Sequence, residues 1–323
     1  MIDIGKSRFL VSGGTGFIGG ALVRRLIDAG AMVRATHFTR APNFRHSRLQ
    51  WSRADLREEA DCDAVSQSVD CIIHCAAVTS GAADIASAPL MHFTPNIVLN
   101  ARLMQAAYRA GVKRFVFISS AAAYPPRGDR PLAETEIFDA DPPDVYFAAG
   151  WMKRMAETAC RLYGEKIRPA MPTLVIRPSN VYGPGDKFAW QRSHVTAALV
   201  RRVVERQRPI IVWGNGQQVR DVIYIDDFVT GVLATLAADV PYLVVNIAAG
   251  RGYSIEQILR TALEADGFGD AEVRFDLSRP VTADKVLLDV SLARRMFGFE
   301  AKTTLASGLR KTADWLRANP VKD

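Results

Sequence analysis

The sequence predicts an α/β protein built on a doubly wound parallel sheet, with a smaller C-terminal α/β region. Short apolar runs alternate with helical periodicity through the first half of the chain, which is typical of parallel strands joined by crossover helices. The first run is followed directly by a glycine-rich turn and a helix. Beyond Pro178 the alternation loosens into loops and isolated helices. The 323 residues are enough for one large domain or two ordinary ones.

The first unit, a strand at 8–12, a glycine turn and a helix ended by Gly30, is typical of a Rossmann dinucleotide fold. The glycines have the spacing GxxGxxG. Gly13 permits the tight turn, Gly16 lets the backbone approach a pyrophosphate, and Gly19 permits close helix–strand packing. Three residues between these glycines complete the predicted cofactor loop: Thr15, Phe17 and Ile18.

The second strand, 32–36, indicates which cofactor binds. An NAD site usually has an acid at the end of this strand, where it binds the ribose 2′-hydroxyl. This chain has His37 and Arg40 there instead, and a cationic group suits a 2′-phosphate. We therefore favour NADP(H) over NAD. The alternative is that Arg40 is a surface loop residue with no role in cofactor binding. Further cofactor contacts are predicted at the ends of later strands: Asp55, Leu56, Ala76, Ala77, Pro178, Asn180 and Val181.

The remaining elements follow from the same patterns. Strands are predicted at 49–53, 71–77, 114–119, 174–176 and 210–213, and helices at 93–110, 195–206, 255–265 and 305–315. His74, inside its strand, is predicted to be a core histidine. Strands at 222–225 and 244–247 are expected to rejoin the main sheet. The dinucleotide domain is thus predicted at 1–177 plus about 222–250, and a second region, for the substrate, at 178–221 and 251–323.

Composition excludes several classes of protein. Apolar residues make up 49% and charged residues 23%, which is ordinary for a soluble globular protein. The four cysteines have no CxxC spacing, so we expect thiols of a cytoplasmic protein and no metal site. No apolar run reaches the ~18 residues of a membrane span. The net charge of +7 is scattered and lacks a nucleic-acid-binding motif, so it indicates a basic surface or a phosphate-bearing small ligand.

The segment 145–157 carries the predicted chemistry. Tyr146 and Lys153 lie on one predicted helix, and a phenol beside an ammonium is a good proton donor. Such a pair needs a spacing of four, whereas here it is seven. Ala149, which has no acid–base chemistry, stands four residues before the lysine.

The glycine turn, the run Ser-Ser-Ala-Ala-Ala-Tyr at 119–124 and the lysine helix resemble the extended short-chain dehydrogenase/reductases over nearly the whole chain. The resemblance implies a catalytic Ser, Tyr and Lys, in which Tyr is the acid and Lys also binds the cofactor. It selects Ser120 and Lys153, with Glu157 four residues on, and puts Ala149 at the tyrosine position. The other register, with Tyr146 as acid and Gly150 in place of the lysine, is disfavoured.

Within that family, the segments 180–188, 193–202 and 212–227 are similar to the GDP-fucose synthases, which epimerise and reduce a GDP-4-keto-6-deoxy sugar. By this resemblance His194 is an epimerisation acid, and Ala122 replaces a cysteine base, which puts epimerisation in doubt. Ala121 and Ala122 also disfavour a dehydratase. The resemblance implies a nucleotide diphosphate-sugar ligand, held by Ser120, Asn180, His194, Arg202, Trp213, Arg220 and Lys285.

The expected function is therefore NADP-dependent reduction of a GDP-linked 4-keto-6-deoxy sugar, with or without epimerisation, impaired by Ala149. Two alternatives stay open: an NAD-dependent nucleotide-sugar 4-epimerase and a non-catalytic nucleotide-sugar binding protein. Alanine at 149 is either natural or introduced. The resemblance also implies a homodimer formed by the helices near 93–110 and 150–163.

Overall fold

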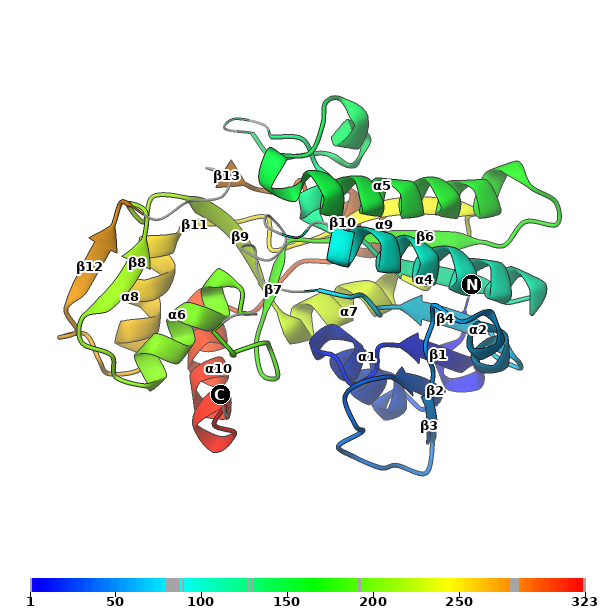
Figure 1. Cartoon of the computed structure of the whole chain (residues 1–323), viewed down its shortest axis with the longest axis horizontal. Helices are drawn as coiled ribbons and strands as arrows, with labels where there is room; N and C mark the ends of the chain where they lie inside the picture. Colours follow the sequence, from blue (N-terminus) through cyan, green and yellow to red (C-terminus); the bar gives the residue numbers. More distant parts are fainter. Residues whose placement is uncertain are drawn as a thin grey trace.

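The computed structural model describes residues 2–79, 88, 90–126, 128, 130–190, 193–278 and 285–321. Figure 1 shows two parts, a larger one around the main sheet and a smaller one at the left of the view. Three helices pack on one another in the smaller part: α6 (Val195–Val204), α8 (Ile255–Ala265) and α10 (Leu305–Ala318).

The main sheet has seven strands, all paired in parallel, in the order β10-β6-β5-β4-β1-β2-β3. The order reverses between β1 and β4, and ligands of such sheets bind at the carboxyl ends of the strands at this switch point. The strands are β1 (Arg8–Ser12), β2 (Met32–His37), β3 (Leu49–Arg53), β4 (Cys71–His74), β5 (Arg114–Ile118), β6 (Thr173–Pro178) and β10 (Tyr242–Ile247).

Helices cover both faces of this sheet (Figure 1). Leu10 packs with α2 and α4 on one face, whereas its neighbours Phe9 and Val11 belong to the core beneath α1 and α7. This alternation follows from the two-residue period of a strand, and both faces are apolar because both are covered. The covering helices are α1 (Phe17–Asp28), α2 (Glu59–Ser66), α4 (Leu90–Arg109), α5 (Phe147–Arg161), α7 (Ile225–Thr235) and α9 (Ser291–Phe297).

The smaller part has two sheets of its own. In one, β9 (Val219–Tyr224) lies between β11 (Gly252–Ser254) and β13 (Lys285–Val286) and also pairs with β7 (Asn180–Tyr182). In the other, β8 (Ile210–Trp213) pairs with β12 (Val273–Asp276). Within the described ranges, no helix combines the length and apolar character that crossing a bilayer requires, and no cluster of side chains suits a metal ion.

The structure corrects one expectation about the sheet. β10 joins the main sheet beside β6, as predicted, but β9 does not. β9 instead pairs with β7, β11 and β13 in the smaller part. Its buried Asp221 carboxylate accepts the backbone N–H groups of Ala249 and Gly250, which follow β10, at 3.0 Å each. An apolar run does not reveal which of two sheets it joins, and the proposed domain division stays a prediction.

Two elements end at least two residues earlier than predicted. β4 stops at His74 because the N–H groups of Cys75 and Ala76 leave the strand ladder and donate to Ser12 Oγ. α6 stops at Val204 because Arg206 has a positive φ of 56°.

Candidate active site

The glycine turn brings β1, β2 and β4 together. Gly13 has φ 68°, and a Cβ there would lie 2.9 Å from Ala76 Cα. Its N–H donates to Thr36 Oγ1 at 3.0 Å. A Cβ on Gly19 would lie 2.2 Å from the carbonyl oxygen of Gly13. Gly19 is therefore needed for packing the helix against the turn itself rather than against a strand, which corrects the expected reason for this glycine.

The start of α1 fits a pyrophosphate. Gly16 is its N-cap residue and has no side chain with which to cap the helix, and the first turn contains no acid. The first N–H groups of a helix have no partner within the helix, so they are available to an anion. Thr15, Phe17 and Ile18 are each partly accessible around this point.

The end of β2 carries two cationic or ionisable side chains. The His37 ring meets Trp51 edge-on, with ring centroids 6.2 Å apart. Arg40 Nη1 donates to the Thr15 carbonyl oxygen at 3.1 Å, which places the guanidinium beside the glycine turn. Asp55 is already engaged by Arg57, with Nη2 and Oδ2 2.6 Å apart, and Leu56 is buried.

His74 is a structural residue, as predicted. Ser12 Oγ accepts two backbone N–H groups and lies 2.6 Å from His74 Nδ1, so its own proton must be donated to that nitrogen. His74 Nε2 then carries the ring proton and donates to Asn100 Oδ1 at 2.8 Å. Burial lowers the pKa of His74 to about 4, in keeping with a neutral ring. The histidine thus holds the end of β4 in place without titrating near neutrality.

Ser120 and Lys153 both have polar contacts at the carboxyl end of β5. Ser120 Oγ accepts the N–H of Ala122 at 3.1 Å, which leaves its own proton to donate. Lys153 Nζ donates to the carbonyl oxygen of Ile118 at 2.8 Å and lies 4.7 Å from the Phe117 ring centroid. The residue is half-buried. Desolvation by burial lowers the lysine pKa to about 8.

The geometry of α5 favours the register with Ala149 at the tyrosine position. Ala149 lies one helical turn before Lys153 and is half-buried. A Cβ on Gly150 would lie 2.5 Å from Pro142 Cβ and 2.8 Å from the Ala122 carbonyl oxygen. Position 150 thus has no room for a lysine. Tyr146 is the N-cap residue of the helix.

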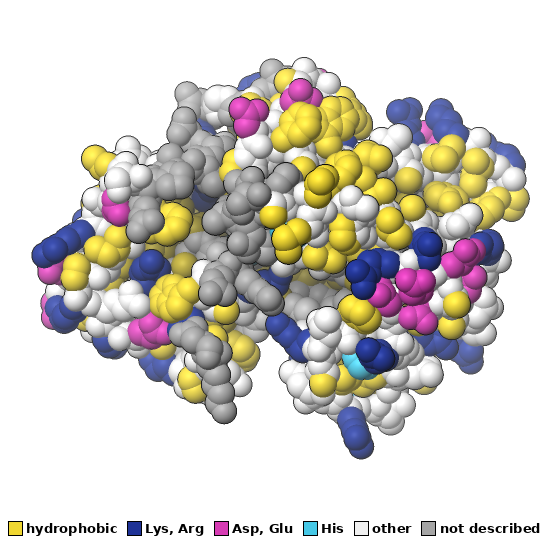
Figure 2. All heavy atoms as spheres, viewed as in Figure 1, with side chains coloured by type: hydrophobic (Ala, Val, Ile, Leu, Met, Phe, Trp, Pro, Cys, Tyr) yellow, Lys and Arg dark blue, Asp and Glu magenta, His cyan; other side chains and the backbone are white. Residues whose placement is uncertain are grey.

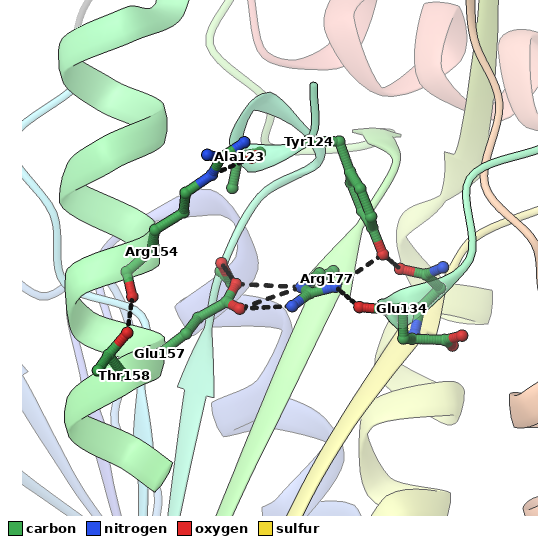
Figure 3. A network of polar contacts seen from close by, with 9 residues as sticks. Ala123, Tyr124, Glu134, Arg154, Glu157, Thr158 and Arg177 are labelled. Carbon is green, nitrogen blue, oxygen red and sulfur yellow. Dashed lines mark hydrogen bonds and ion pairs between the residues drawn. The ribbon is translucent and has the colours of Figure 1, made fainter. Parts of the chain in front are cut away.

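A buried polar network missed by the sequence reasoning ties α5 to the sheet (Figure 3). Glu157, one turn after the lysine, accepts from the hydroxyl of Ser119 and from Arg177, with Nη2 and Oε2 2.6 Å apart. Arg177 also donates to Tyr124 Oη at 2.9 Å, and Tyr124 donates to Asn246 Oδ1 at 2.7 Å. Only the Lys–Glu spacing was a sequence signal for this network.

Apart from Ser120, the predicted substrate residues lie in the smaller part and the loops that lead to it. Arg220 and Lys285 lie on the adjacent strands β9 and β13, and Asn180 Nδ2 donates to the Asp221 carbonyl oxygen at 3.2 Å. His194 is the exposed N-cap residue of α6, and Arg202 lies 4.8 Å from the ring centroid of Trp190. Trp213 is half exposed at the end of β8. Of the predicted cofactor residues, Pro178 is the last residue of β6 and Val181 lies on β7.

The chain is similar to two groups of enzymes over nearly its whole length. It is 27% identical to GDP-L-fucose synthase 1 of Arabidopsis thaliana over 322 residues, which covers 97% of this chain and 94% of that protein. It is 30% identical to a dTDP-4-dehydro-6-deoxy-D-allose reductase of a Streptomyces species, with 95% of both chains covered.

The fold is shared with solved nucleotide-sugar enzymes. The UDP-glucose 4-epimerase of Thermotoga maritima, solved with UDP-glucose, superposes with a TM-score of 0.86 at 26% identity and covers 96% of this chain and 99% of its own. The model of the NAD dependent epimerase/dehydratase family matches residues 9–248, a span that includes the glycine turn, Ser120 and Lys153. The chain therefore belongs to this family, the extended short-chain dehydrogenase/reductases.

Proposed function

We propose that the chain is an NADP-dependent oxidoreductase that reduces the keto group of a nucleotide-linked 4-keto-6-deoxy sugar, with GDP as the favoured nucleotide. The position of Ser120 and Lys153 at the carboxyl end of β5, next to the strand β4 after which Ala76 lies against the glycine turn, carries this proposal. The names of the similar proteins, a GDP-L-fucose synthase and a dTDP-keto-sugar reductase, support reduction and a 6-deoxy sugar.

The residues around the glycine turn fit a nicotinamide dinucleotide. The uncapped start of α1 suits its pyrophosphate, and Arg40, held over Thr15, suits a 2′-phosphate. The absence of an acid at the end of β2 supports NADP over NAD. When bound, the reduced cofactor supplies the hydride.

The side chains near the end of β5 determine which reaction we propose for this chain. The Ser120 hydroxyl, oriented by the Ala122 N–H, is placed to donate to a carbonyl oxygen as negative charge develops there. Ala122 has no group to remove a proton next to the carbonyl, so reduction is proposed without epimerisation. Ala149 has no phenol, and loss of a general acid lowers a rate by about 10²- to 10⁴-fold.

A direct assay tests the proposal. The purified chain is mixed with a GDP-4-keto-6-deoxy sugar and either NADPH or NADH, and cofactor absorbance is followed. We expect slow oxidation of NADPH, faster than that of NADH, and an increase of about 10²- to 10⁴-fold in an Ala149→Tyr variant. Interconversion of sugars without net cofactor oxidation would instead identify a 4-epimerase. Binding of both ligands without turnover in either protein would identify a binding protein.

A further inference from the structure

We propose that Lys153 is itself the proton donor of this active site, acting through one water molecule in the space that a tyrosine at position 149 would occupy. This inference rests on the proposed reductase function and assigns its acid. Ala149 and Lys153 lie one turn apart on the same face of α5, and Ala149 ends at a methyl group.

The surroundings of Lys153 hold its ammonium at the end of β5. One of its protons is donated to the Ile118 carbonyl oxygen, two residues before Ser120, and two protons remain. The Phe117 ring closes one side. A lysine in ordinary solvent is too weak an acid to lose a proton near neutrality, whereas desolvation lowers the pKa of Lys153 to about 8, which suits acid catalysis.

The charged and titratable groups that face Lys153 come from both packed elements. From α5, the charge of Glu157 raises the lysine pKa, but this carboxylate is held by Ser119 and Arg177. Cys160 follows on the same helix, and Cys75 lies after β4; burial raises the pKa of both thiols, so both are neutral. His74 is neutral for the reason given above. Lys153 is therefore the group in this set that changes protonation between pH 7 and 9.

The proton transfer from Lys153 to the carbonyl oxygen requires no reagent other than water. A reduced nicotinamide held at the glycine turn would supply the hydride to the sugar carbonyl carbon, and Lys153 would supply the proton. In that proton transfer one N–H bond of the Lys153 ammonium breaks. Its proton passes to the intervening water, and that water gives a proton to the carbonyl oxygen, which becomes a hydroxyl group. The neutral amine then regains a proton from solvent.

Two measurements test the assignment. Competitive acetylation of the folded protein without cofactor reports the pKa of Lys153, which we expect near 8, against about 10.4 for an ordinary lysine. The kcat of the wild-type protein should fall above pH 8, because the donor must be protonated. Lys153→Arg keeps the charge but does not release its proton, so kcat should fall about 10²- to 10⁴-fold and lose this pH dependence. NADPH affinity should change only a few-fold.

The controls separate this proposal from the proposed function. Tyr146→Phe removes the nearest phenol on the same helix and should leave kcat within about twofold. A large loss in Tyr146→Phe, an unchanged rate in Lys153→Arg, or turnover seen only in Ala149→Tyr would each overturn the role of Lys153 while leaving the reductase intact. If neither the wild-type protein nor Ala149→Tyr oxidises NADPH, the proposed reductase function is rejected. If Lys153→Arg does not fold, an acetylation pKa near 10 still refutes the assignment.

Discussion

Glu157 shows how one side chain supports the site without touching it. Glu157 is 1% exposed, and its carboxylate accepts from Ser119, which directly follows β5, and from Arg177 on β6. Figure 3 shows the Glu157 and Arg177 side chains pointing toward one another. Ser119 precedes Ser120, and Glu157 follows Lys153 by one turn, so the network fixes both catalytic candidates relative to each other. The same fixation makes the carboxylate costly to remove, because the Arg177 guanidinium would stay buried.

Replacing Glu157 by glutamine should therefore destabilise the protein strongly. A buried guanidinium that loses its partner typically costs about 3–5 kcal/mol in the free energy of unfolding. The matched control is Glu165→Gln, which removes an exposed ion pair with Arg161 near the end of the same helix and should cost under about 1 kcal/mol. Urea denaturation of both variants measures the difference. Equal stabilities would mean that the network contributes little.

Asp186 is predicted to make stability depend on pH. Burial raises the pKa of its carboxyl to about 7, and Oδ2 has no hydrogen-bond partner among the described residues. The folded protein thus binds a proton that the unfolded chain has released above about pH 4. The contribution of the Asp186 carboxyl to the free energy of unfolding is therefore lost as the pH rises from about 4 to 7. Asp186→Asn should then gain about 1–3 kcal/mol at pH 8 and much less at pH 4, measured by chemical denaturation. The same gain at both pH values would contradict the prediction.

At the scale of elements, the first turn of α5 lies so close to Pro142 and to the Ala122 carbonyl oxygen that a Cβ on Gly150 would overlap both. Gly150→Ala should destabilise the protein by about 1–3 kcal/mol, because the added methyl overlaps atoms that include backbone. Gly269→Ala, at a glycine with no heavy atom within 4 Å of the added Cβ, is the matched control and should stay within about 0.5 kcal/mol. Thermal unfolding compares the two, and an equal effect would show that the entry of α5 readily shifts.

The sequence predicts elements well where an apolar run has clear polar or glycine boundaries. The strands at 8–12, 49–53 and 210–213 and the helix at 255–265 have the predicted bounds. Sheet membership is harder to predict: β9 has the apolar pattern of a main-sheet strand but belongs to the smaller part. The pairing partners of a strand are set by long-range contacts, which local periodicity does not contain.

The candidate site follows the same rule. Ser120, Lys153 and the alanine one turn before the lysine are assigned by the resemblance of short local motifs to the family's pattern. The ion pair between Glu157 and Arg177 joins different elements and needed the structure, as did the tautomer of His74. Desolvation of Lys153 could not be predicted from the sequence either, because it depends on which atoms surround the ammonium in the folded chain.

At the scale of the whole molecule, α4 and α5 lie side by side and leave an apolar surface outward. Figure 2 shows hydrophobic side chains gathered over these two helices. Large apolar residues on them are strongly exposed, among them Leu90 (72%), Met91 (66%), Phe147 (49%) and Met155 (48%). Soluble monomers rarely leave such patches uncovered, and two copies that pair through α4 and α5 would form a four-helix interface.

We therefore expect a homodimer that a single charge at this surface weakens. Met155→Lys would bury an ammonium between the paired helices, and a loss of about 2 kcal/mol raises the dissociation constant on the order of 30-fold. Met296→Lys is the matched control, because Met296 is similarly exposed (42%) on α9, which packs against α7 and β10 away from this surface. Sedimentation velocity over a concentration series distinguishes the two variants. A wild-type monomer at all concentrations, or equal weakening by both lysines, would rule out pairing through α4 and α5.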